Sequence, residues 1–342
     1  MQEKHRPPMP EQKPADYSED RYFGGPDSPR RADGLQFGYV PYSLISEHND
    51  SNKITRECYD SYMIEYRYLN SWEADTHITL WNKTFDTPIM VGGLSAIAPL
   101  LHPNGMVELA RGAAAMNTPA LFGYISNAEV DELVATGADV IRIVKMQRDN
   151  EAVLADIRHD EECGCFAVAM DIDHGIAPDG TLYHPTPDYG QLCPKTTEEM
   201  AMFVQSTRLP FIAKGVLSVQ DAKACAEAGV AAILLSHHKG EIVDAVPPLY
   251  VLPEIKAAVG DRMKIFVDCG ITSGIDAYKA LALGADAVCV ARNLVKPYMK
   301  EGAPGVENRL RELNAELRGI MSRTCTLDTA HFDPTTLRKK NW

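Results

Sequence analysis

Eight short apolar runs, each followed by an amphipathic segment, occupy the chain from residue 87 onward. Runs of this length and hydrophobicity are typical of parallel strands that are buried on both faces. The segments between them place apolar residues at i, i+3 and i+4, and several end at glycine, as amphipathic helices do. The runs are residues 88–93, 120–125, 140–146, 166–172, 210–216, 231–236, 264–271 and 287–292.

This alternation of strand and helix limits the fold to two classes of α/β protein. Eight parallel strands with crossover helices can close into a barrel, whereas an open doubly wound sheet shows the same alternation without closing. A helix follows all eight runs, no GxGxxG follows the first run, and about 230 residues suit one barrel. We therefore predict an α/β fold with a (β/α)8 TIM barrel over residues 87–320.

Two segments precede the predicted barrel and one follows it. Residues 1–35 are rich in Pro and charge, and we expect them to form an arm over a surface or a partner subunit. Residues 36–86 contain two strand-like runs, 63–69 and 77–85, which we interpret as a cover segment over one end of the barrel. Residues 321–342 form a C-terminal tail.

The charge balance argues against two kinds of partner. The chain has 342 residues, with 34 Lys and Arg against 47 Asp and Glu, and its net charge of -13 argues against nucleic-acid and anionic-membrane surfaces. No window approaches the ~18 uninterrupted apolar residues of a membrane span. Residues 1–20 hold no apolar leader. We therefore expect a cytoplasmic protein with no membrane partner.

The 8 cysteines are scattered and lie mostly inside apolar segments. Such residues are typical of reduced, buried thiols in an intracellular protein. Cys163 and Cys165 form a CxC pair, but no second pair at ligand spacing lies nearby. We therefore predict no metal site.

Polar side chains gather where the predicted strands end. In a (β/α)8 barrel the carboxyl ends of all strands face the active-site mouth. A single charged residue there is more often a solvated rim residue, but charged residues on five strands predict a polar pocket. Those five are Asp171, Lys214, His238, Asp268 and Arg292. Other mouth positions are Gly92, Gly93, Gly123, Arg142, Val144, Asp173, His237 and Gly270.

The last two predicted strands carry a phosphate signal. The sequence DCGITSG at 268–274 brings small residues and hydroxyls to the start of a helix, and VAR at 290–292 adds a guanidinium. Barrels commonly bind phosphate with the loops after strands seven and eight and with a helix N-terminus. The alternative is a simple tight turn.

These residues resemble the FMN-dependent α-hydroxy-acid oxidases and dehydrogenases, the family of glycolate oxidase and lactate oxidase. That family reads LPxxxKGIxxxEDA, SNHGGRQLD, DGGIRRGxDVxKALALGA and GR. This chain reads LPFIAKGVLSVQDA, SHHKGEIVD, DCGITSGIDAYKALALGA and AR in the same order over residues 209–318. The resemblance is weaker in residues 87–115 and at MDI in residues 170–172.

The resemblance implies FMN as the cofactor and gives roles to individual residues. Lys214 would lie by flavin N1 and O2 and stabilise negative charge on the reduced ring, and His238 would be the catalytic base. Asp171 would hydrogen-bond to that histidine and orient it. The expected cofactor-binding residues are Gly92, Gly93, Gly123, Arg142, Lys214, Ser236, Asp268, Gly270, Thr272, Ala291 and Arg292.

The sequence departs from the family pattern mainly where substrate would bind. The arginine that clamps a substrate carboxylate is replaced by Glu241, which would repel one. A flavin-contacting glutamine aligns with Arg142 and the strand-three tyrosine with Val144. A loop-four arginine is missing from residues 174–180, and the phosphate arginine aligns with Thr272. The expected substrate residues are Arg142, Val144, Glu241 and, where an N-terminal tyrosine aligns, Arg21 and Tyr22.

The resemblance therefore implies an FMN-dependent oxidoreductase that oxidises an alcohol-type (CH–OH) or related small-molecule substrate by His-assisted hydride transfer. An ordinary small 2-hydroxy acid is predicted to be a poor substrate. The alternatives are an FMN-dependent isomerase without net redox and a non-catalytic flavin-binding protein. The electron acceptor could be oxygen or another molecule, and the family's habit predicts a homotetramer.

Overall fold

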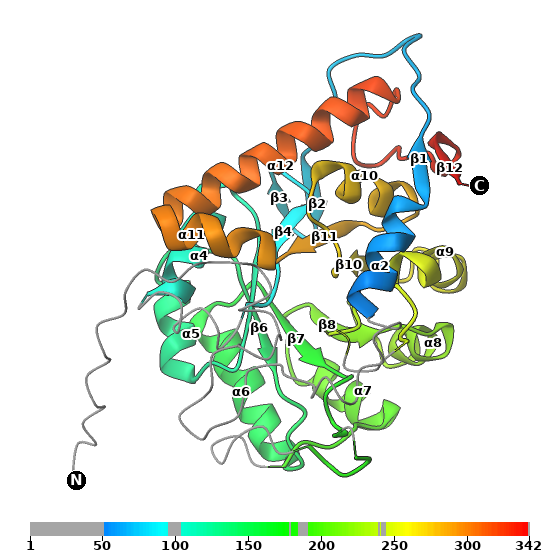
Figure 1. Cartoon of the computed structure of the whole chain (residues 1–342). Coiled ribbons are helices and arrows are strands. Elements are labelled where there is room, and N and C mark those ends of the chain that lie inside the picture. The colour runs from blue at the N-terminus through cyan, green and yellow to red at the C-terminus, as the bar shows by residue number, and fades with distance from the viewer. Residues whose placement is uncertain are drawn as a thin grey trace. The chain divides into compact units, whose positions relative to one another are not determined.

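Eight parallel strands close into a barrel in which each strand pairs with the next in the chain (Figure 1). The last strand, β11, pairs with the first, β4, through Val288–Val290 and Ile89–Val91. Each predicted run contains one strand, so the predicted (β/α)8 barrel is confirmed. The strands are β4 (Ile89–Val91), β5 (Ala120–Gly123), β6 (Val140–Val144), β7 (Ala167–Asp171), β8 (Phe211–Val216), β9 (Ala232–Leu235), β10 (Lys264–Val267) and β11 (Ala287–Val290).

The computed structural model describes residues 51–94, 104–177, 179–183, 191–238, 240 and 244–340. Side chains of alternate strand residues fill the barrel, among them Leu121, Ile141 and Phe266. The other residues of each strand lie under the surrounding helices, because successive side chains of a strand point to opposite faces. Both faces are therefore apolar, as the sequence pattern requires.

Amphipathic helices connect the strands and cover the outside of the barrel. Ser126 and Glu129 form a capping box at the start of α5, and Thr196 and Glu199 form another at α7, so unpaired backbone N–H groups are satisfied there. The helices are α4 (Gly105–Ala115), α5 (Asn127–Val134), α6 (Asn150–Cys163), α7 (Thr197–Gln205), α8 (Val219–Glu227), α9 (Pro248–Val259), α10 (Gly274–Ala282), the 3-10 helix η3 (Arg292–Leu294), α11 (Val295–Glu301) and α12 (Ala303–Arg323).

The long helix α12 packs across α10 and α4 (Figure 1). A Cβ atom at Gly112 of α4 would lie 2.4 Å from Val306 Cβ of α12. The two helices can approach this closely only because position 112 has no side chain. Leu313 and Leu317 of α12 are fully buried, so this helix completes the outer layer after the last strand.

A short hairpin covers the amino-terminal end of the barrel. Strands β2 (Ile78–Leu80) and β3 (Lys83–Phe85) pair antiparallel, and Ile78, Leu80 and Phe85 join the barrel core. Lys83 Nζ contacts Asp139 Oδ1 at 2.6 Å, just before β6 begins, which ties the hairpin to that end. The opposite, carboxyl end is therefore the one left for a site.

Helix α2 (Ser51–Asp60) lies beside the loop that follows β10. A Cβ atom at Gly270, where φ is +78°, would lie 2.8 Å from Thr55 Cγ2 of α2. Strand β1 (Tyr62–Ile64), which follows α2, pairs antiparallel with β12 (Leu337–Lys339) after the 3-10 helix η4 (Pro334–Thr336). The division into arm, cover segment, barrel and tail stays a prediction, since residues 1–35 lie outside the described residues.

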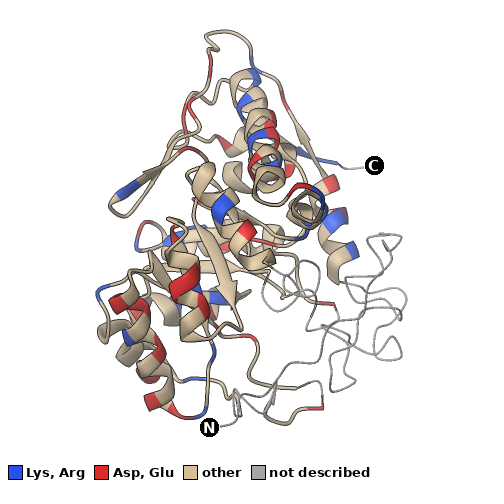
Figure 2. Ribbon diagram, turned by 90° about the vertical axis from the view of Figure 1, so that its left-hand side faces the viewer, with Lys and Arg blue, Asp and Glu red and all other residues tan. Residues whose placement is uncertain are grey.

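Figure 2 shows charged residues of both signs along the helices, with Lys and Arg in blue and Asp and Glu in red. Helix α12 alone carries Glu307, Arg309, Arg311, Glu312 and further charges of both signs. Over the described part of the chain, the apolar stretches of the helices are too short for a membrane crossing.

We expect Phe85→Ala to lower the free energy of unfolding by about 3–5 kcal/mol, because it removes a fully buried ring from the core under the hairpin. Urea unfolding measures the change. The neighbouring Thr84→Ala is the control, since Thr84 is exposed and the change should stay within about 0.5 kcal/mol. Equal effects of the two substitutions would show that the hairpin does not close the core.

Candidate active site

The barrel presents one inward position from each strand at its carboxyl end. Each lies two residues beyond an inward core residue such as Leu121, Ile143 or Phe266, so the alternation of a strand directs it to the same side. These eight positions form the floor of the mouth. They are Gly92, Gly123, Lys145, Asp171, Lys214, Ser236, Asp268 and Ala291. Seven of them were expected from the sequence, and Lys145 was not.

Asp171 lies between two lysines in this layer. Lys214 Nζ donates to Asp171 Oδ1 at 2.7 Å, and Lys145 Nζ donates to Asp171 Oδ2. All three side chains are buried. Lys145 Nζ also lies 3.9 Å from the ring centroid of Tyr124, a cation–π contact. Both oxygens of this carboxylate are therefore occupied by ammonium groups.

His238 lies beside this cluster, with a backbone φ of 46° that is uncommon for a non-glycine residue. Its Nδ1 lies 3.1 Å from Asp173 Oδ1, 3.4 Å from Lys214 Nζ and 3.8 Å from Asp171 Oδ1. Only the Asp173 contact is a hydrogen bond to a carboxylate. The expected partner of His238 was Asp171, so the structure places a different carboxylate in that position.

Aromatic rings line one side of His238. The ring of His174 stacks on it, with centroids 4.8 Å apart and an interplanar angle of 24°. Tyr183 and Tyr124 contact His174 edge-on, at 4.4 Å and 6.2 Å between ring centroids. His174 belongs to the segment in which the family's loop-four arginine is missing, so stacked rings occur in this region.

The pKa values of the cluster reflect its charges. Burial would raise the pKa of Asp171, but the positive charges of Lys145 and Lys214 hold it well below the usual range. Burial would likewise raise the pKa of Asp173, which His238 and Lys214 instead lower. The pKa of Lys214 is raised, because the nearby carboxylates, Asp171 first, outweigh its burial. Both carboxylates and Lys214 are therefore charged at neutral pH.

Arg142 and Val144 lie on the outer face of β6, which contradicts the expectation that they contact the flavin and the substrate. Arg142 donates to Asp160 Oδ1 at 3.1 Å and to Asp156 Oδ1 at 3.2 Å, both on α6. Burial raises the pKa of Asp160 to about 6, although Arg142 opposes the rise. The expectation that Arg142 and Val144 face the mouth is out of step with the alternation of β6 by one residue, and such a shift moves every side chain to the other face. The inward residues are Ile143 and Lys145.

The period of two in β6 is the signal that would have revealed Lys145. Ile141 and Ile143 are inward, so the next inward position is 145. Lys145 is therefore the inward residue at the end of β6, next to Val144, with which the family's strand-three tyrosine was expected to align.

The residues expected around the phosphate and ribityl chain lie at the ends of β10 and β11. Arg292 Nη2 donates to Asn52 Oδ1 at 2.9 Å. Thr272 donates from its backbone N and its hydroxyl to Asp276 Oδ2, at 3.1 and 3.0 Å. Arg56 of α2 donates to the carbonyl of Gly270 at 3.1 Å. Arg56 also pairs with Asp276 through Nη1 and Nη2, at 3.0 and 2.7 Å, so α2 is tied to the loop after β10 and to α10 by a guanidinium that the sequence did not predict.

The remaining predicted residues fall into two groups. Gly93 lies against Ile143, since an added Cβ atom would be 3.0 Å from its Cδ1. His237 Nε2 lies 3.0 Å from Thr55 Oγ1. Glu241, Arg21 and Tyr22 lie outside the described residues.

The sequence of this chain matches a known protein family over most of its length. Residues 35–181 and 189–339 match the family described as FMN-dependent dehydrogenase. The chain belongs to the FMN-dependent dehydrogenase family. It is an FMN-dependent oxidoreductase of the α-hydroxy-acid oxidase kind that acts on CH–OH donors, and FMN is its cofactor.

Relatives and solved structures agree with this assignment. The chain is 31% identical to 4-hydroxymandelate oxidase of Amycolatopsis orientalis over 281 residues, which cover 73% of this chain and 78% of the relative. It is 27% identical to 2-hydroxyacid oxidase 1 of Homo sapiens over 308 residues, covering 79% and 83%. A mandelate oxidase variant with a monooxide FMN adduct has a TM-score of 0.77 and 29% identity, covering 86% of this chain and 93% of that chain.

The residues of the mouth fit FMN. A Cβ atom at Gly92 would lie 3.2 Å from Ala291 Cβ, so β4 and β11 meet here with no side chain larger than a methyl group. Such bare strand ends leave backbone for a flat ring to approach. Lys214 supplies a buried cation, and Arg292 supplies a guanidinium beside the predicted phosphate loop. These are the donors that an anionic flavin phosphate and a reduced ring need.

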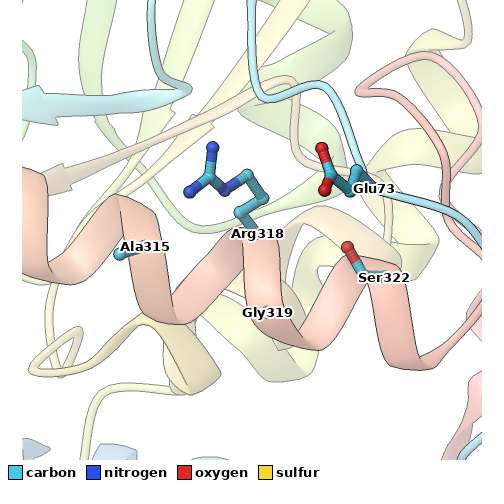
Figure 3. Close-up of a pocket in the computed structure, with 5 residues that line it drawn as sticks. All are labelled: Glu73, Ala315, Arg318, Gly319 and Ser322. Atoms are coloured by element: carbon cyan, nitrogen blue, oxygen red, sulfur yellow. The ribbon is translucent and has the colours of Figure 1, made fainter.

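A separate surface pocket of about 260 Å³ lies along α12 (Figure 3). Glu73 and four residues of α12 line it: Ala315, Arg318, Gly319 and Ser322. None of these residues belongs to a barrel strand or to the predicted site. The pocket is therefore separate from the mouth.

We expect Arg142→Met to lower the free energy of unfolding by about 3–5 kcal/mol, because it leaves the buried Asp160 carboxylate without its cation. FMN affinity should stay within about threefold, since Arg142 lies outside the barrel wall. Urea unfolding and flavin fluorescence titration measure the two effects. Arg148→Met, at an exposed position, is the control. A large loss of FMN affinity at unchanged stability would show that Arg142 contacts the flavin and would contradict its outward placement.

Proposed function

We propose that this family member oxidises a CH–OH group with His238 as the base. The observation that carries the proposal is the hydrogen bond between His238 Nδ1 and Asp173, next to the buried Lys145–Asp171–Lys214 cluster. Among the described residues, no hydrogen-bond partner of His238 Nε2 is seen. A histidine held at one nitrogen presents the other to a substrate as a base.

The reaction needs one proton acceptor and one hydride acceptor. His238 Nε2 would take the proton of the substrate hydroxyl while a hydride leaves the carbon that bears this hydroxyl, so that a C=O bond forms. The bound FMN supplies the two-electron acceptor for that hydride. Asp171 and Asp173 stay ionised and would stabilise the imidazolium that results. Lys214, by resemblance, would place positive charge beside N1 and O2 of the ring.

The substrate is proposed to be something other than a small 2-hydroxy acid. Glu241 stands in the sequence where the family has the arginine that binds a carboxylate, and the loop-four arginine is absent from residues 174–180. Exchanging a bidentate guanidinium for a carboxylate turns attraction into repulsion. An uncharged carbinol, or one with a cationic group, therefore suits this mouth better. Acceptor identity, assembly as a homotetramer and cytoplasmic location stay predictions.

Anaerobic bleaching of the flavin tests the proposed base. We expect 2-hydroxy-phenylacetamide, an uncharged CH–OH donor, to bleach the holoenzyme, and His238→Ala to slow bleaching by about 10²–10⁴-fold. His331→Ala, at an exposed histidine, is the control. Bleaching at the wild-type rate in His238→Ala would remove this residue from the role of base. A yellow protein that no CH–OH donor bleaches would favour a flavoprotein without net oxidation.

We expect Glu241→Arg to increase the rate of flavin reduction by mandelate about 10–100-fold, because a charge-assisted pair replaces a repulsion. Stopped-flow absorbance under anaerobic conditions measures the rate. 2-Hydroxy-phenylacetamide, which lacks the carboxylate, is the control substrate and should gain nothing. An unchanged ratio of the two rates would show that Glu241 does not select against carboxylates.

A further inference from the structure

We propose that Asp173, and not Asp171, is the positioning residue for His238 in this chain, because Lys145 holds Asp171. The inference rests on the proposed function in that it takes His238 as the base. Asp173 lies two residues beyond Asp171 on the same segment, at the end of β7. Asp171 would thus pair with the buried lysines and Asp173 would orient His238, whereas the resemblance implies that Asp171 orients the histidine.

The contacts of Asp171 leave little for His238. Its Oδ1 accepts from Lys214 at 2.7 Å, its Oδ2 accepts from Lys145, and its nearest approach to His238 Nδ1 is 3.8 Å. At that distance no hydrogen bond exists. Without Lys145, Asp171 Oδ2 would have no hydrogen-bond partner among the described residues. The bond from Lys145 therefore explains why Asp171 does not orient His238.

Asp173 has the geometry for the role. Its Oδ1 lies 3.1 Å from His238 Nδ1, and its Oδ2 is buried without a hydrogen-bond partner in the described part of the chain. A Cβ atom at Gly215 would lie 2.3 Å from Asp173 Cγ. Gly215, at a φ of +96°, lies at the register shift between Lys214 and Val216. This bulge makes room for the carboxylate beside the lysine.

The groups facing His238 come from three elements. Asp171, Asp173 and His174 belong to β7 and the loop after it, Lys214 belongs to β8, and Lys145, the residue after β6, bonds to Asp171. Of these, only Asp173 can accept a proton from Nδ1 at hydrogen-bond distance. The neutral ring is then held with the proton on Nδ1 and a lone pair on Nε2, which is the tautomer that a base at Nε2 requires.

Asp173→Asn tests the proposal, because an amide can donate to Nδ1 and so favour the tautomer with the proton on Nε2. In the holoenzyme, nitrogen NMR of isotope-labelled histidine should show His238 change from the Nδ1–H to the Nε2–H form. The kcat for anaerobic reduction by 2-hydroxy-phenylacetamide should fall about 10²–10⁴-fold with KM nearly unchanged. Asp179→Asn, at an exposed residue of the same segment, is the control and should change neither.

Asp171→Asn gives the opposite outcome if the proposal is wrong. We expect it to weaken FMN binding or stability, since two buried ammonium groups lose their partner, while the Nδ1–H tautomer persists. A tautomer change in Asp171→Asn but not in Asp173→Asn would overturn the proposal. If Asp173→Asn changes the tautomer while His238→Ala bleaches normally, the positioning contact holds and the proposed base does not.

A double-mutant cycle tests the part assigned to Lys145. Lys145→Met frees Asp171 Oδ2, so Asp171 can turn toward His238 and share the task. In that background, Asp173→Asn should reduce kcat by less than about tenfold. An equal loss from Asp173→Asn with and without Lys145 would show that Lys145 does not divert Asp171.

Discussion

Closure of the barrel is the constraint on which the site depends. Because every strand is hydrogen-bonded on both edges, none can slide or rotate alone, and its side chains alternate strictly between the interior and the helices. The interior below the mouth is filled by apolar residues such as Leu121, Ile143 and Phe266. Charge can therefore enter only at the last inward layer, and there the backbone fixes which residues meet: Lys145, Asp171 and Lys214 on three neighbouring strands.

Charge compensation then decides how this layer works. A carboxylate as buried as Asp171 needs a positive group within hydrogen-bond distance. Each of the two buried lysines likewise needs a negative group. With Lys214 alone, Asp171 would keep one oxygen for a histidine. Lys145 supplies a second ammonium, which bonds to that oxygen. His238 Nδ1 therefore bonds to Asp173, at 3.1 Å, and lies 3.8 Å from Asp171. One added cation thus changes the partners of the groups around it.

The sequence predicted the fold well because the fold signal is local and repeated eight times, so errors at one strand do not matter. Five of the eight mouth positions, Gly92, Gly123, Asp171, Lys214 and Asp268, could be predicted because each follows an apolar run at its end, and the resemblance added Ser236 and Ala291. On β6 the prediction was wrong by one residue, since every position of the strand is buried and hydrophobicity does not distinguish its two faces. Arg142 pairs with Asp160 on the following helix, α6. His238 Nδ1 lies 3.1 Å from Asp173 and 3.8 Å from Asp171, a difference in space that no sequence pattern carries.

The agreement and most of the departures occupy different sides of the barrel. The segments that match the family most specifically lie on β8, on β10 and after β11, where the resemblance places Lys214, Asp268 and Arg292 around the flavin. By the resemblance, most departures lie at the end of β6 and in the segments that follow β7 and β9, and Thr272, after β10, is a departure beside the expected phosphate. A cofactor of fixed shape constrains one side, whereas a substrate constrains the other only through its own chemistry. The proposed loss of the carboxylate clamp would therefore leave Lys214, Asp268 and Arg292 in place, and the proposed contact of His238 with Asp173 would follow from the second cation beside Asp171.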